Sequence, residues 1–142
     1  MKNAIIFCLG TWFAAQACLA ESSTTYYYDK YGGASGRAIE SGNRTSCYDK
    51  YGSTQGSARN DNTATYYYDK NGSSVGKSVT SGNRTTCYDK YGSTEGSART
   101  AGNTTYYYDK YGGSCGKAVT TGNRTSYYDK YGGTTGSART SK

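Results

Sequence analysis

The feature that most constrains this chain is a Tyr-Asp-x-x-Gly motif that returns every twenty residues. It first stands at Tyr28-Asp29-Lys30-Tyr31-Gly32, and its aspartate returns at Asp49, Asp69, Asp89, Asp109 and Asp129. A repeat of fixed period predicts that each copy forms one structural unit that packs against the next copy. The sequence therefore predicts six tandem structural units of about twenty residues each.

Each unit has the pattern of a β-hairpin. The first segment, residues 25–28, is built from Thr and Tyr, which favour strands. Asp29 and Gly32 suit a type I turn that is closed by a residue with positive φ, and Asp at this position accepts hydrogen bonds from the turn amides. A second segment, residues 34–40, is followed by Gly42-Asn43, which is a two-residue hairpin signal. No stretch after the first twenty residues has helical periodicity.

Tyrosine has to build the interior, because the chain has 18 Tyr and only 2 Phe, and aliphatic residues are scarce. A buried Tyr removes about 150–250 Å² from water. With one bulged residue in the turn, Tyr28 is expected opposite Ala34 and Tyr26 opposite Gly36, so that rings cover glycines on a buried face. This expectation assigns structural roles to Tyr28, Tyr48, Tyr68, Tyr88, Tyr108 and Tyr128 and to Gly36, Gly56, Gly76, Gly96, Gly116 and Gly136.

The other face is expected to point outward and to alternate in type between odd and even units. This alternation gives a super-repeat of forty residues and a pseudo-threefold arrangement. Aromatic rings stack on sugars, and cations lie over ring faces, so this face is a candidate ligand-binding surface for a glycan or another cell-surface polymer. Its members are Tyr27, Arg37, Tyr67, Lys77, Tyr107 and Lys117. The competing interpretation is that these tyrosines only pack.

The way in which the units close follows from the two ends of the repeat region. The first and last units look like the middle ones, whereas an open stack needs atypical capping repeats to protect its sheet edges. We therefore expect an all-β, closed, flower-like or barrel-like ring of six hairpins. A β-trefoil also has six hairpins, but its usual core is aliphatic. An open β-solenoid remains the structural alternative.

The first twenty residues have the pattern of a secretory signal peptide. Lys2 is followed by an apolar run and then by small residues. Cleavage after Ala20 would leave a single repeat domain over residues 21–142, secreted or located in the periplasm or outer envelope. Cleavage after Ala17 would leave Cys18 first, as in a bacterial lipoprotein, and lipidation of Cys18 would then tether the protein to a membrane.

Several classes of chemistry find no support in the sequence. The chain has no His and no Cys-x-x-Cys pair, so that neither a zinc site nor a histidine base is expected. The repeated aspartates are explained by their turns, and each turn carries one carboxylate beside a Lys, too few for calcium. Cys47 and Cys87 replace Tyr in their units and are interpreted as fillers of a half-buried face. We expect no enzyme, no cofactor and no metal.

The formal net charge of +7 is spread evenly over the repeats. Together with secretion, this dispersion argues against a nucleic-acid partner. The resulting expectation is a non-enzymatic protein that acts through its surface.

The motif Tyr-x-Tyr-Asp-x-x-Gly, at residues 26–32, 66–72 and 106–112, resembles the YD repeats of bacterial Rhs proteins. The added glycine at Gly36 and Gly76 is closer to the small secreted beta-flower proteins. The resemblance implies an all-β repeat shell or ring and brings no established activity. Encapsulation by Rhs proteins does not carry over, because this chain is small and has no toxin domain. The function expected is a structural or surface-interaction module of the cell envelope, with a carbohydrate-binding module as the alternative.

Overall fold

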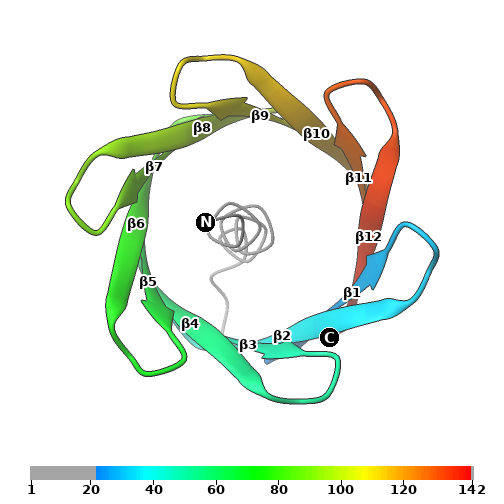
Figure 1. Ribbon diagram of the computed structural model, residues 1–142, viewed down its shortest axis with the longest axis horizontal. Coiled ribbons are helices and arrows are strands. Elements are labelled where there is room, and N and C mark those ends of the chain that lie inside the picture. The colour runs from blue at the N-terminus through cyan, green and yellow to red at the C-terminus, as the bar shows by residue number, and fades with distance from the viewer. Residues whose placement is uncertain (1–21, 142) are drawn as a thin grey trace.

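A computed structural model describes residues 22–141, and these residues form a single closed antiparallel β-barrel (Figure 1). The residues of the expected signal peptide, 1–20, and the expected lipidation site, Cys18, lie outside the described residues. The strands are β1 (Ser23–Asp29), β2 (Ala34–Ser41), β3 (Arg44–Asp49), β4 (Thr54–Asp61), β5 (Ala64–Asp69), β6 (Ser74–Ser81), β7 (Arg84–Asp89), β8 (Thr94–Ala101), β9 (Thr104–Asp109), β10 (Ser114–Thr121), β11 (Arg124–Asp129) and β12 (Thr134–Ser141).

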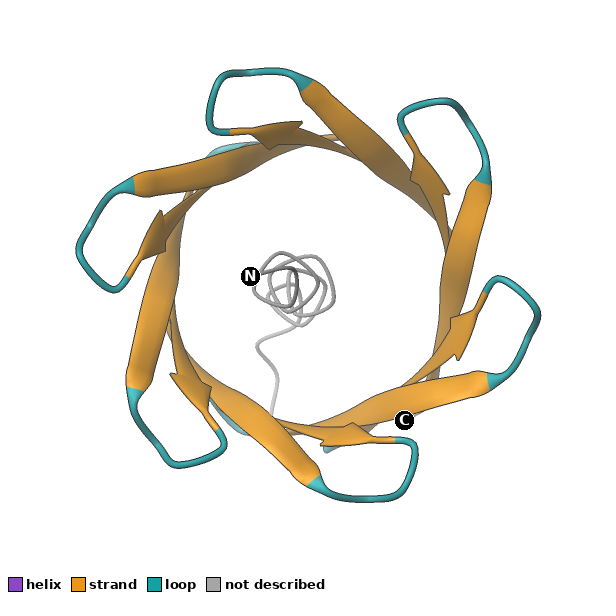
Figure 2. Ribbon diagram, viewed as in Figure 1, coloured by secondary structure: helices purple, strands orange, loops and turns teal. Residues whose placement is uncertain are grey.

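The strands follow one another around the ring in sequence order, and β1 pairs with β12 to close it. The predicted ring of hairpin repeats is therefore confirmed, and the chain is neither an open solenoid nor a trefoil. Six longer turns flare outward around the ring (Figure 2), while tight two-residue turns join the hairpins at the other end of the strands.

The outward turns have the predicted geometry. The amide of Gly32 donates to the carbonyl oxygen of Asp29 at 3.1 Å, and the amide of Asp29 donates to the carbonyl oxygen of Gly33 at 2.8 Å. Gly32 has a φ of 83°, a backbone conformation that residues other than glycine rarely adopt. Asp29 Oδ1 accepts from the amides of Tyr31 and Gly33, both at 2.8 Å. The repeated aspartate is thus the hydrogen-bond acceptor that fixes each turn.

A second irregularity lies just beyond each turn and was missed by the sequence-based register. Tyr28 lies opposite Ala34 as expected, but Tyr27 lies opposite Gly36, so that Ser35 is an extra, unpaired residue. One extra residue moves every following side chain to the other face of its strand. Tyr26 therefore lies opposite Arg37, and the prediction that it lies opposite Gly36 is wrong.

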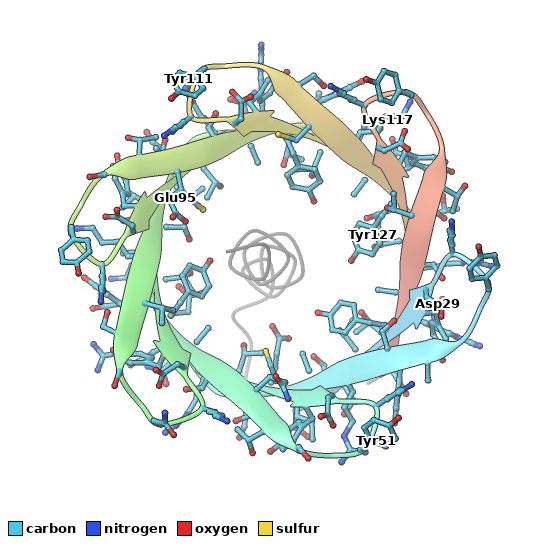
Figure 3. All side chains as sticks on the ribbon, viewed as in Figure 1. Asp29, Tyr51, Glu95, Tyr111, Lys117 and Tyr127 are labelled. Carbon is cyan, nitrogen blue, oxygen red and sulfur yellow. The ribbon has the colours of Figure 1, made fainter. Side chains whose placement is uncertain are left out.

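This bulge reverses the predicted face of the tyrosine-bearing strands, whereas Gly36 and Ala38 face the interior and Arg37 points outward as predicted. The residues expected to be buried against glycine are half-buried on the outer wall: Tyr28, Tyr48, Tyr68, Tyr88, Tyr108 and Tyr128. The position before each of them points into the barrel, as labelled Tyr127 does in Figure 3. We call these two surfaces the inner wall and the outer wall.

The glycines of the inner wall have a backbone role. A Cβ at Gly76 would overlap the carbonyl oxygen of Tyr88 on the next strand, and a Cβ at Gly36 would overlap that of Tyr48. The same contact recurs between Gly116 and Tyr128. The glycine is therefore required by the close approach of two strands at the bulge and not by a tyrosine ring of the predicted series.

The inner wall alternates large and small residues around the ring. Tyr107 lies between Ala98 on β8 and Gly116 on β10, and Tyr127 lies between Ala118 on β10 and Gly136 on β12. Ala98, Tyr107 and Ala118 form a hydrophobic cluster against which Tyr127 packs. The expectation that tyrosine supplies the interior beside small residues holds, with the tyrosine one position earlier in the repeat.

Candidate binding surfaces

The predicted ligand-binding set is divided between the two walls. Arg37, Lys77 and Lys117 are exposed on the outer wall, and Figure 3 shows labelled Lys117 on the outside of the ring. Tyr27, Tyr67 and Tyr107 face the interior, and Tyr67 and Tyr107 are only 4 % and 5 % exposed. The prediction that these tyrosines and cations form one surface is therefore wrong, because the bulge places them on opposite sides of the sheet.

Tyr67 is held in the interior by a hydrogen bond as well as by packing. Its hydroxyl lies 2.9 Å from Ser78 Oγ, and the serine is also buried. A buried phenol needs such a partner, because an unpaired hydroxyl in an apolar surrounding is costly. This tyrosine contributes to the fold, which agrees with the packing alternative for these residues.

Burial also governs the acidity of the inner wall. It raises the pKa of the phenols of Tyr27, Tyr107 and Tyr127 well above the usual value for tyrosine. For Tyr27 the neighbouring Tyr127, Cys47 and Glu40 add to this effect. Burial raises the pKa of the Cys47 thiol to about 11. The inner wall therefore holds neutral phenols and a neutral thiol at physiological pH, with no activated nucleophile among these groups.

The three cysteines occupy two kinds of position in the repeat. Cys47 and Cys87 take the inward place that tyrosine has in other units, and Cys115 is the exposed bulge residue of β10. Cys47 is half-buried, Cys87 is buried and Cys115 is exposed. Cys47 and Cys87 thus fill the interior, as the sequence predicted. In residues 22–141 no group of three His, Cys, Asp or Glu side chains is placed to hold a metal ion.

The outward turns present the most exposed aromatic side chains of the described chain. Tyr31, Tyr51, Tyr91, Tyr111 and Tyr131 are 81 to 85 % exposed. Each ring has the preceding lysine over its face, with Nζ 4.9 to 5.0 Å from the ring centre. Asn71 takes the place of tyrosine in the third turn. We call these turns the tips; labelled Tyr51 and Tyr111 lie at the rim in Figure 3.

The outer wall carries a second arrangement that the sequence reasoning missed. Tyrosine and a cation alternate on neighbouring strands, so that Arg59 lies opposite Tyr66, Tyr66 opposite Lys77, and Lys77 opposite Tyr88. The same order recurs in Arg99, Tyr106, Lys117 and Tyr128 and in Arg139, Tyr26, Arg37 and Tyr48. We call these rows the three ladders.

Cation–π contacts run along the ladders. Arg37 lies 5.3 Å from the ring centre of Tyr48, and Lys77 and Lys117 lie 5.9 and 5.7 Å from those of Tyr88 and Tyr128. Arg59 also covers Tyr66, at 5.7 Å. Tyr26 and Tyr106, which belong to the same rows, are 42 % and 41 % exposed. The alternation of Tyr26 with Arg37 becomes visible in the sequence only once the bulge is counted.

The bulge residue is the most variable position of the repeat. It is Ser35, Gln55, Val75, Glu95, Cys115 and Thr135 in successive units, and each of these residues is exposed. This variability was the sequence signal for an unpaired residue, because a side chain without a cross-strand partner is free of pairing constraints.

Comparison with known proteins adds no assignment to these surfaces. Within residues 22–141 there is no helix with the length and apolar character of a membrane span. No model of a known protein family matches the chain. No curated protein is significantly similar to it in sequence.

Proposed function

We propose that this protein is a non-enzymatic surface-interaction module of the secreted or cell-envelope type, in which a rigid ring displays many copies of one contact element. The observation that carries the proposal is the set of exposed tip tyrosines, each with a lysine over its ring. Exposed rings are normally scattered singly on a protein surface, whereas here the same ring recurs at nearly every tip.

The construction of the tip supports a role in contact rather than in chemistry. Asp49 Oδ1 accepts from the amides of Tyr51 and Ser53, both at 2.9 Å, so that the backbone beneath the ring is fixed before any partner arrives. A preorganised contact loses less conformational freedom on binding. Several identical contacts on one rigid body also gain from avidity when the partner is a repeating polymer.

A carbohydrate-binding module is the second candidate function. It is favoured by the pairing of aromatic rings with cations at the tips and along the ladders, since a ring face stacks on a sugar and a cation pairs with its acidic groups. The predicted partner is a glycan or another cell-surface polymer. Lipid anchorage through Cys18 remains the alternative to free secretion.

Binding of the folded protein to an array of immobilised glycans tests the proposal. The wild-type protein is compared with a variant in which all five tip tyrosines are replaced by Ser. We expect the variant to keep its thermal unfolding profile and to lose its density-dependent binding to immobilised uncharged glycans. Retention of full binding by the variant would remove the tips from the interaction. No binding by the wild-type protein at high micromolar concentration would end the carbohydrate alternative.

A further inference from the structure

The uncompensated positive charge of the described chain is concentrated on the outer wall. Each Lys and Arg within residues 22–141 lies either at a tip, beside the aspartate of its turn, or on the outer wall. At the tips the two charges offset one another, as for Asp29 and Lys30. On the outer wall the cations are Arg37, Arg44, Arg59, Lys77, Arg84, Arg99, Lys117, Arg124 and Arg139, and all of them are exposed.

The outer wall also places arginines directly against one another. Arg44 lies opposite Arg59, Arg84 opposite Arg99, and Arg124 opposite Arg139. Like charges directly opposite across two strands are destabilising. The arrangement recurs in each super-repeat, and each arginine pair is continuous with one end of a ladder. A bound anion would relieve the repulsion at these three places.

Each arginine pair together with its ladder makes one wall site that crosses five neighbouring strands. In one site the order is Arg44, Arg59, Tyr66, Lys77 and Tyr88, and each member lies opposite the next. Neighbouring strands are about 4.8 Å apart, so the site is about 19 Å long, and Arg59 and Lys77 are about 10 Å apart.

This spacing selects among polyanions. Two linked pyranose rings have about the same length as the cation-to-cation step, with a tyrosine between the cations to meet a sugar face. DNA carries a phosphate about every 3.4 Å along each strand, which is far denser than the cations of a wall site. The wall sites therefore match a linear glycan with an acidic group on alternate sugars more closely than they match a nucleic acid.

We infer that the outer wall carries three equivalent binding sites for a linear acidic polysaccharide, in which cations bind the sulfate or carboxylate groups and tyrosines stack on the sugar rings between them. This inference rests on the carbohydrate-binding alternative given above and names its ligand class and its position. The three sites are related by the pseudo-threefold repeat, so that one long chain can follow the wall or three short chains can bind at once.

Titration calorimetry with a heparin hexasaccharide at physiological ionic strength tests the inference. A wall variant replaces Arg37, Arg59, Lys77, Arg99, Lys117 and Arg139 by Gln. A matched tip variant replaces Lys30, Lys50, Lys70, Lys90, Lys110 and Lys130 by Gln, and it loses the same formal charge. We expect the wild-type protein to bind three hexasaccharides, the wall variant to bind at least about tenfold more weakly, and the tip variant to change by less than about twofold.

Other outcomes would overturn the inference in distinguishable ways. Equal weakening in both variants would show a general charge effect without a site. Loss in the tip variant alone would leave the tips as the interaction surface and remove the wall sites. Tighter binding of single-stranded dT20 than of the hexasaccharide would replace the ligand class by nucleic acid. Absence of hexasaccharide binding to the wild-type protein would end the inference while leaving the array experiment to decide the proposed function.

A second measurement guards against a variant that fails to fold. Backbone amide resonances of the isotope-labelled wild-type protein are followed during addition of the hexasaccharide. We expect shifts along residues 59, 66, 77 and 88 and their counterparts, and little change at the tips. Shifts confined to the tips would contradict the wall sites without any substitution.

Discussion

Tyr66 and Tyr67 are neighbours in the chain and lie on opposite walls of the barrel. Tyr67 is 4 % exposed and shares a hydrogen bond with Ser78, whereas Tyr66 lies opposite two cations and has the guanidinium of Arg59 over its ring. The same side chain therefore supports the interior at one position and forms part of a charged outer surface at the next. Because tyrosine occurs on both walls of this barrel, residue type alone does not determine its role. Its position relative to the bulge does.

The comparison predicts its largest effect for substitutions of these two neighbours. We expect Tyr67→Ala to destabilise the barrel by about 4 kcal/mol, because it removes a buried ring and leaves Ser78 without its partner. Tyr66→Ala serves as the matched control and is expected to cost about 1 kcal/mol, through one lost cation–π contact and some outer packing. Urea unfolding measures both values. Equal losses would show that the two walls are not distinct.

The second-largest difference in stability is expected between substitutions of Gly76 and of Lys77, the cation that follows it in the sequence. Gly76→Ala is expected to destabilise by about 3 kcal/mol, because the new Cβ would overlap the carbonyl oxygen of Tyr88 and force the strands apart at the bulge. The Lys77 side chain points outward, so Lys77→Ala is expected to lower the free energy of unfolding by less than about 1 kcal/mol. Thermal unfolding of both variants checks the difference. A mild Gly76→Ala variant would mean that the close approach of β6 and β7 is not required.

Alkaline pH should weaken the inner wall. Burial raises the pKa values of Tyr27, Tyr107 and Tyr127, and it raises that of Cys47 to about 11. The unfolded chain releases these protons near pH 8.5 for Cys and pH 10 for Tyr, whereas the folded barrel retains them. Stability is therefore fully present below these values and falls as pH rises, by about 1.4 kcal/mol per pH unit for each group.

Urea unfolding between pH 8 and pH 12 measures this fall. Tyr127→Phe removes one of the retained protons, so its stability should decline less steeply with pH than that of the wild-type protein. A free energy of unfolding that stays constant up to pH 11 would contradict the burial of these phenols.

The smallest effect is expected where a residue belongs to neither wall. The bulge residues have no cross-strand partner, and Val75 and Cys115 are both exposed. Exchange of Val75 for Thr, or of Cys115 for Ser, should change the free energy of unfolding by less than about 0.5 kcal/mol. A larger loss in differential scanning calorimetry would show that the bulge side chain contributes to packing after all.

The hairpins, the turns and the closed ring could be predicted because they follow from local signals. Asp29 and Gly32 specify the turn by hydrogen bonding and backbone conformation, and Gly42-Asn43 specifies the tight turn, so that both are readable within a few residues. Closure of the ring could be predicted because the first and last units resemble the middle ones and are not atypical capping repeats. None of these steps required knowledge of which face is buried.

The face of the tyrosine-bearing strands could not be predicted by the same reasoning, because it depends on one unpaired residue. Constancy of Tyr28 and Gly36 among the units was interpreted as a sign of mutual burial. In the structure Gly36 is constant because it makes room for the backbone carbonyl oxygen of Tyr48, the counterpart of Tyr28 in the next unit, and this contact does not involve the tyrosine ring. The inward position tolerates Tyr27 or Cys47. The ladders of the candidate site were missed for the same reason.

The seam between β1 and β12 has a consequence for how this chain could be rearranged. Across the seam Thr25 lies opposite Thr140 and Tyr27 opposite Ala138, in the same register in which Thr105 and Tyr107 lie opposite Thr100 and Ala98. The pairing of β12 with β1 is thus chemically equivalent to the pairing of strands that are adjacent in the sequence. A circular permutant that is opened in the tight turn after Ala101, with Ser141 joined to Thr24 by a Gly-Asn linker, should fold to the same ring. Recombination that inserts or removes one forty-residue segment would likewise meet matching edges, so the circumference of such a ring can change in whole steps during evolution.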